Sequence, residues 1–122
     1  CAAVNALNDN APRRQIPAAQ PFRSPEAAWF WTMGVLVARR DGVGASFGTQ
    51  RQVCEPDDVV MTLDRLYRQR RVDLAHARVL RVYGERGTPP DHGKPQERAD
   101  QRLWREAMDR MGVALRARGI VA

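Results

Sequence analysis

The feature that most constrains this chain is the helical spacing of apolar residues between residues 57 and 86. Val59, Leu63 and Leu66 recur at steps of three or four residues, which places them on one face of an α-helix. A second run with the same spacing ends at Tyr83. Each of two amphipathic helices must bury its apolar face, so this stretch predicts a fold built from packed helices.

Polar residues mark the ends of both predicted helices. Asp57 and Asp58 follow a proline, which fits the first helical turn, and carboxylates are favoured at the positive end of the helix dipole. Asp73 is a suitable cap for a second helix, which we expect to run from Leu74 to Tyr83. Gly84 is the predicted stop, because glycine commonly ends helices.

The connection between the two helices is short and rich in arginine. It covers residues 69–72 and lacks the glycine that is common in helix-turn-helix motifs. Two short helices joined by a tight turn are nevertheless the skeleton of helix-turn-helix DNA readers, whose second helix enters the major groove. The sequence predicts such a motif at 57–86, with a plain helical hairpin and a protein-docking surface as alternatives.

The predicted DNA-binding residues have two roles. Arginines near the connection would hold phosphates and fix the register, whereas the outer face of the second helix would contact base edges. The candidates are Arg65, Arg68, Arg70, Arg71, Ala77, Arg78 and Arg81. His76 falls on the opposite, apolar face, and we expect it to be a core or capping residue. It has no second ligand at metal-binding spacing.

Charge and composition favour a polyanionic partner. The chain of 122 residues has a net charge of +6, with nineteen arginines and one lysine among its basic residues. Arginine suits bidentate contact with phosphate or guanine, although a GC-rich genome also enriches it. Segments 1–56, 57–86 and 87–122 each have a net charge of +2 (6−4, 7−5 and 7−5), so the charge is not gathered in one part. Double-stranded DNA is the expected partner.

The segment between Ser24 and Arg40 predicts a long buried helix. A capping serine, a proline and a glutamate open it, and its body is apolar nearly all round. Trp29, Phe30 and Trp31 are its largest side chains. They are expected in the core, and the alternative is a surface that docks a larger protein or a second copy of the chain.

The C-terminal part predicts one more helix. Residues 96–111 show an apolar stripe with Ala99 on it and Trp104 at its edge, and Gly112 is the predicted stop. Residues 113–118 are expected to add a last turn, after which Ile120 and Val121 dock on the core. Residues 1–23 lack periodicity and predict a flexible tail.

The sequence contains no pattern typical of an enzyme. Gly42, Gly44 and Gly48 would suit a phosphate-binding loop only with a strand before them and a helix directly after. A linker, or a hairpin through 45–53, is expected instead. Asp91 and His92 share a Pro/Gly-rich loop with Lys94, but acid–base catalysis needs a pocket that such a loop does not offer. We expect no catalytic residue, no cofactor and no metal.

Cysteine use and hydropathy suggest a compartment. Cys1 and Cys54 are too few for a disulfide framework or a zinc site, so a reducing cytoplasm is expected. No apolar run approaches the roughly 20 residues that span a bilayer. The minor alternative is a lipid anchor through Cys1, since a mature bacterial lipoprotein begins at an acylated cysteine.

Together these patterns predict a small all-α domain of about four helices over residues 24–122, with a helix-turn-helix-like pair and a flexible N-terminal tail. The first functional hypothesis is a DNA-binding transcriptional regulator or accessory factor. The alternative is a non-enzymatic helical adaptor that binds another protein.

Overall fold

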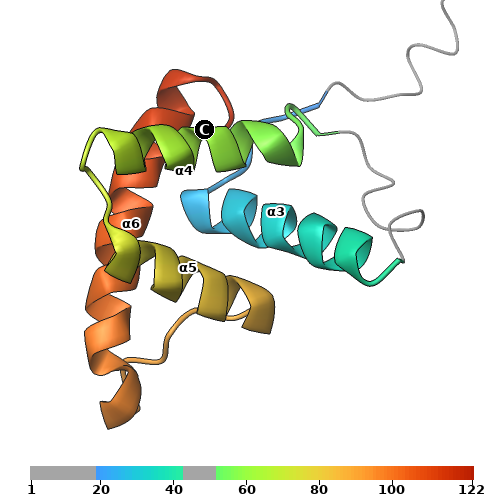
Figure 1. Ribbon diagram of the computed structural model, residues 1–122. Helices are drawn as coiled ribbons and strands as arrows, with labels where there is room; N and C mark the ends of the chain where they lie inside the picture. Colours follow the sequence, from blue (N-terminus) through green and yellow to red (C-terminus); the bar gives the residue numbers. More distant parts are fainter. Residues whose placement is uncertain (1–18, 43–51) are drawn as a thin grey trace, which may run out of the picture.

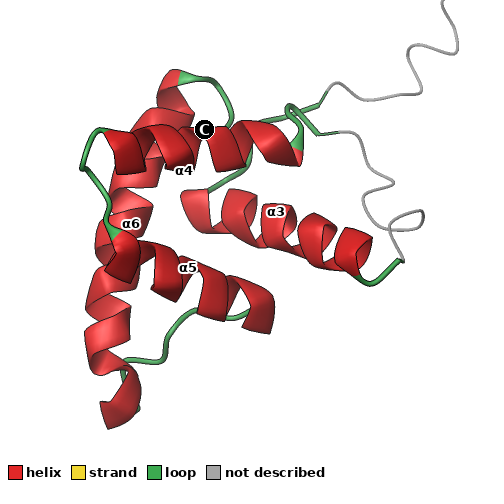
Figure 2. Ribbon diagram, viewed as in Figure 1, coloured by secondary structure: helices red, strands yellow, loops and turns green. Residues whose placement is uncertain are grey.

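The prediction of an all-α fold is confirmed. The computed structural model describes residues 19–42 and 52–122, and these residues form four α-helices and one 3-10 helix (Figure 2). The helices are α3 (Pro25–Arg40), α4 (Pro56–Arg68), α5 (Leu74–Arg86), η1 (Pro95–Glu97) and α6 (Arg98–Ala117). Most of the predicted tail and of the glycine-containing loop lies outside the described residues. No described helix is both long enough and apolar enough to cross a membrane.

The longest helix, α6, packs against the other three. In Figure 1 it runs along one side of the molecule, and α3 lies between α4 and α5. The predicted pair, α4 and α5, therefore packs mainly on α3 and α6, and the two helices make few contacts with each other. This arrangement leaves the α4–α5 connection at an outer corner of the fold (Figure 1).

The helix starts lie where the capping residues predict them. The Ser24 hydroxyl accepts a hydrogen bond from the Ala27 amide at 3.1 Å, and Pro25 occupies the first turn of α3. The Asp73 carboxylate accepts from the Ala75 amide at 2.9 Å and so caps α5. Such caps satisfy backbone N–H groups that have no partner inside the helix.

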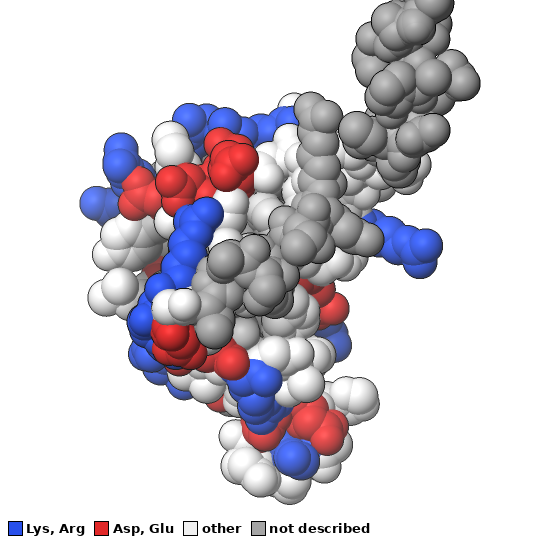
Figure 3. All heavy atoms as spheres, turned by 90° about the vertical axis from the view of Figure 1, so that its right-hand side faces the viewer, with Lys and Arg blue, Asp and Glu red and all other residues white. Residues whose placement is uncertain are grey.

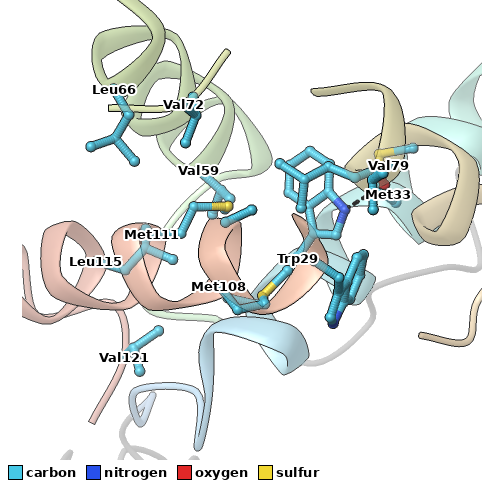
Figure 4. Packing of buried hydrophobic residues seen from close by; sticks show 14 of the residues in the cluster. Trp29, Met33, Val59, Leu66, Val72, Val79, Met108, Met111, Leu115 and Val121 are labelled. Atoms are coloured by element: carbon cyan, nitrogen blue, oxygen red, sulfur yellow. Dashed lines mark hydrogen bonds between the residues drawn. The ribbon is translucent and has the colours of Figure 1, made fainter. Parts of the chain in front are cut away.

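One hydrophobic core joins all four helices. Trp29 of α3 lies near its centre, and its indole N–H donates to the Leu80 carbonyl of α5 at 2.9 Å (Figure 4). The side chains at 0% exposure come from all four helices, namely Ala28, Thr32, Val59, Val79, Leu80, Ala107, Met111 and Leu115. Because each helix buries apolar side chains against at least two others, the core fixes their relative positions.

Two predicted helix stops are instead helix crossings. At Gly84 the backbone of α5 lies so close to α3 that a Cβ would be 2.7 Å from Met33 Cγ. At Gly112 a Cβ would be 3.1 Å from Pro25 Cγ. Both helices continue past these glycines, and α5 ends at Gly87, which has a left-handed backbone with φ of 86°.

The predicted flexible tail is too long at its C-terminal end. Phe22 forms an isolated parallel bridge with Val121, and its amide donates to the Ile120 carbonyl at 2.9 Å. The docking of Ile120 and Val121 on the core is confirmed, since both are at most 5% exposed. Phe22 also contacts Trp31, with ring centroids 5.3 Å apart. Its aromatic ring and backbone therefore make Phe22 part of the fold.

The predicted apolar stripe of α6 is confirmed at Ala107, Met108 and Met111, which are buried, but differs at two other positions. Trp104, placed at the edge, is only 3% exposed, whereas Ala99 is exposed. The Trp104 ring stacks on Phe30 at 5.5 Å, and its N–H donates to Glu26 at 2.6 Å. These aromatic contacts bury more apolar surface than an alanine offers and so set which face of α6 points inward.

Candidate nucleic-acid interface and adjoining groove

The α4–α5 connection is a well-defined turn. Arg70 has a left-handed backbone, with φ of 61°, the conformation that glycine adopts most easily. The Arg71 amide donates to the Leu66 carbonyl at 2.9 Å, and Val72 is 2% exposed. These contacts hold the turn although it contains no glycine, so the backbone positions of its arginines are fixed.

The turn presents several guanidinium groups to solvent. Arg65, Arg68, Arg70 and Arg71 are all exposed. Arg68 forms an ion pair with Asp64 one turn earlier on α4. The other three have no ion pair among the described residues. Arg68, Arg70 and Arg71, which the sequence assigned to phosphate contacts, and the neighbouring candidate Arg65 are thus all open to solvent.

The residues assigned to base edges are arranged differently. The Arg78 guanidinium lies 2.6 Å from Asp100 of α6, and the same carboxylate accepts from the Tyr83 hydroxyl at 2.8 Å. Burial and this carboxylate raise the pKa of Tyr83 to about 12. Arg78 is therefore held against its own chain. A base contact by Arg78 would require this ion pair to break.

Ala77 and Arg81 face an apolar groove. The groove has a volume of about 370 Å³ and lies between α4 and α5, with α3 at its base. Met33 and Leu36 of α3 form the base, Val60 and Leu63 form the α4 wall, and Ala77 and Arg81 form the α5 wall. This part of α5 is thus one side of a hollow rather than a protruding edge.

The aromatic cluster of α3 packs within the chain. Trp29 is 4% exposed and packs in the core with residues of α5 and α6, so little of its ring is open to a partner. Phe30 stacks on Trp104, and Trp31 contacts Phe22. Trp29 still lines the groove from below, so it contributes to that surface only at its base.

His76 joins α5 to α6. Its Nδ1 accepts a hydrogen bond from the Asp73 amide at 3.1 Å, and its Nε2 lies 2.9 Å from a carboxylate oxygen of Glu106. The hydrogen bond with His76 and the nearby Arg102 and Arg110 lower the pKa of Glu106. The structure confirms that His76 is a buried capping residue. No cluster of three metal-ligating side chains occurs among the described residues.

Hydrogen bonds with Arg86 and Glu97 hold the loop that contains Asp91, His92 and Lys94. Arg86 donates to the Pro89 carbonyl at 2.7 Å and to Glu97 at 3.1 Å, and Glu97 also accepts from the Asp91 amide at 2.8 Å. Its hydrogen bonds, first of all that from Arg86, lower the pKa of Glu97. The three loop side chains are exposed on an open hollow, and no described contact activates them for acid–base chemistry.

The charges on another face are mixed. Figure 3 views the ends of α3 and α5 that lie opposite the turn, and basic and acidic side chains alternate there. Arg40 on this face contacts Asp41 at 3.3 Å and Glu85 at 3.7 Å. Such self-paired charges offer little to a polyanion, in contrast to the arginines at the turn.

Comparisons with other proteins identify no relative. No family model, curated protein or solved structure matched this chain. The groove between α4 and α5 was not predicted from the sequence. A usable signal was present, because Val60 and Tyr67 share one face of α4 with the predicted core residue Leu63, and Leu74 and Ala77 share one face of α5.

Proposed function

We propose that this protein is a non-enzymatic nucleic-acid-binding protein, a regulator or accessory factor that holds duplex DNA with its α4–α5 turn. The observation that supports the proposal is the group of four exposed arginines in the last turn of α4 and in the connection after it, three of them without an ion pair among the described residues. Guanidinium groups bind phosphate oxygens and release counterions from the duplex, which favours binding at low salt.

The same arrangement supports phosphate contacts more than base reading. Arg78 is paired with Asp100, and Arg81 lines a groove too small for a duplex. Phosphate contacts position a protein but convey no sequence information directly. We therefore expect binding with weak sequence preference.

A titration of fluorescent genomic duplex fragments tests this function. At about 50 mM salt we expect binding that weakens steeply as salt is added. The double substitution R70A/R71A should lower affinity on every fragment alike and reduce the salt slope by roughly two, because two phosphate contacts are lost. The matched control is R105A/R118A, which removes the same charge from α6 and the residue that caps it. Absence of binding at low salt, or an equal effect of both double variants, rejects the proposal.

A second candidate function is a helical adaptor that binds another protein. The specific observation in its favour is the apolar groove among α3, α4 and α5. Monomeric proteins seldom expose extended apolar surface without a use for it. This function does not exclude the first, because the turn and the groove involve different side chains, apart from their common framework of α4 and α5.

A further inference from the structure

The groove between α4 and α5 has the shape of a helix-binding site. On α4, Tyr67 follows the lining residues Val60 and Leu63 at helical spacing, so the α4 side of the groove continues beyond them. On α5, Leu74 precedes Ala77 in the same way. Tyr67 and Leu74 are 45% and 70% exposed, respectively, so the apolar surface extends toward the turn. The base and the α4 wall are apolar, and on the α5 wall Ala77 is followed by Arg81 and Glu85, so the surface suits an amphipathic helix with an apolar stripe and charged side chains beside it.

The charges at the groove favour an acidic occupant. Arg40 and Glu85 at one end lie 3.7 Å apart and largely neutralise each other. Arg81 lies in the α5 wall and has no carboxylate within ion-pair distance among the described residues. A helix with aspartate or glutamate beside its apolar stripe would complement Arg81 without burying an unpaired cation.

The overall charge argues against a second copy of the chain. Each copy has a net charge of +6, so two copies repel each other at low salt, whereas an acidic partner is attracted. We infer that the groove formed by α3, α4 and α5 binds an acidic amphipathic helix of a partner protein. This inference rests on the adaptor function proposed above and is independent of the arginines at the turn.

Two neighbouring residues of α4 supply a matched pair of variants. Val60 lines the groove and is 37% exposed, whereas Met61 is not among the lining residues and is 57% exposed. V60E places a carboxylate in the apolar wall, and M61E makes the same change of charge outside it. Because neither side chain is buried, both variants should fold, which circular dichroism and thermal melting check. Neither residue belongs to the proposed DNA contacts.

The experiment is a selection from a displayed library of random peptides of about 16 residues, or four to five helical turns, on the immobilised full chain. We expect enriched peptides with apolar residues at helical spacing and more Asp and Glu than Lys and Arg. V60E should weaken their binding about tenfold or more, the effect of losing one buried aliphatic contact. M61E should change it less than about twofold.

A charge exchange tests the proposed chemistry. R81E should weaken an enriched acidic peptide about three- to fivefold, the scale of one exposed ion pair, and a peptide with lysine at the facing position should recover that loss. No enrichment, enrichment of basic peptides, or equal binding to the native chain and V60E overturns the inference. A dimer of the native chain in analytical sedimentation, converted to a monomer by V60E, would also overturn the inference. The occupant of the groove would then be a second copy of the chain. R70A/R71A should leave peptide binding unchanged. The peptide selection and the DNA titration therefore test the two proposals independently of each other.

Discussion

His76 Nε2 lies 2.9 Å from Glu106 Oε1, and this contact joins the first turn of α5 to the middle of α6. His76 is 5% exposed, and its Nδ1 also accepts a hydrogen bond from the Asp73 amide. One buried ring is therefore hydrogen-bonded to groups on two different parts of the chain. A buried polar group that loses its partner costs free energy. The imidazole therefore helps to hold the start of α5, together with the Asp73 carboxylate that caps the helix.

We expect H76A to lower the free energy of unfolding by about 2 to 3 kcal/mol, from the lost hydrogen bonds and the space left behind. Urea denaturation followed by circular dichroism measures this. The control is H92A, because His92 is the second of two histidines and is exposed in its loop. Equal effects of the two variants would show that the contact with Glu106 contributes nothing to stability.

Gly84 and Gly112 should respond differently to alanine. In G84A the new Cβ would lie 2.7 Å from Met33 Cγ and 2.8 Å from the Trp29 indole nitrogen, atoms that core packing holds in place. Overpacking should destabilise this variant by about 1 to 2 kcal/mol, even after the gain in helix propensity. G112A meets the movable end of Arg116 and needs a smaller shift of Pro25, so it should cost less. Thermal melting of both variants decides this, and the reverse order would contradict the crossing of α3 and α5.

The backbone of Arg70 allows stability and binding to be separated. R70G should raise the free energy of unfolding by up to about 1 kcal/mol, because glycine adopts a left-handed backbone with less strain. It should also weaken DNA binding, since one cation is lost. R71G removes the same charge from a residue that lacks this backbone conformation, so it should give no gain in stability. Denaturation and DNA titration of both variants are the measurements, and a gain in R71G would argue against the strain.

Stability should fall in acid because three carboxyl groups have lowered pKa values. In Glu97 and Glu106 the pKa lies below the ordinary 4.5, and in Asp73 below the ordinary 3.8. A group with a lowered folded pKa stabilises the fold above its unfolded pKa and loses that effect as pH falls through the folded value. Urea denaturation from neutral pH to about pH 3 should therefore show falling stability that begins near the unfolded values.

The substitution E97Q isolates one of these groups. It removes the carboxylate that binds Arg86 and the Asp91 amide, so the loss of stability in acid should become shallower. E85Q is the control, because Glu85 makes only a surface contact of 3.7 Å with Arg40. An unchanged acid profile in E97Q would assign the pH dependence to other groups.

The helices could be predicted from local sequence patterns. The features that depend on contacts between distant residues could not. Periodicity and caps such as Ser24 and Asp73 depend on nearby residues, so they are readable from the sequence. Gly84 and Gly112 were misread as stops because glycine serves a helix end and a close crossing equally well. Only the position of α3 distinguishes the two roles.

The candidate site was predictable to a similar extent. The arginines of the turn are neighbours in sequence, so their grouping follows from the turn itself. The partner of Arg78 is Asp100, 22 residues away on another helix, and no local pattern specifies that pairing. The groove likewise needs three separate helices. Its acidic-helix preference is a consequence of side chains that meet only after folding.

The bridge between Phe22 and Val121 places the two described ends of the fold side by side, and the Ala122 amide donates to the Phe22 carbonyl at 2.9 Å. A circular permutant that joins residue 122 to residue 19 through a few glycines should therefore retain the helical core, with new termini opened in the interval between α3 and α4. In such a rearranged chain the arginine turn and the groove would keep their places, since neither depends on which residue is synthesised first.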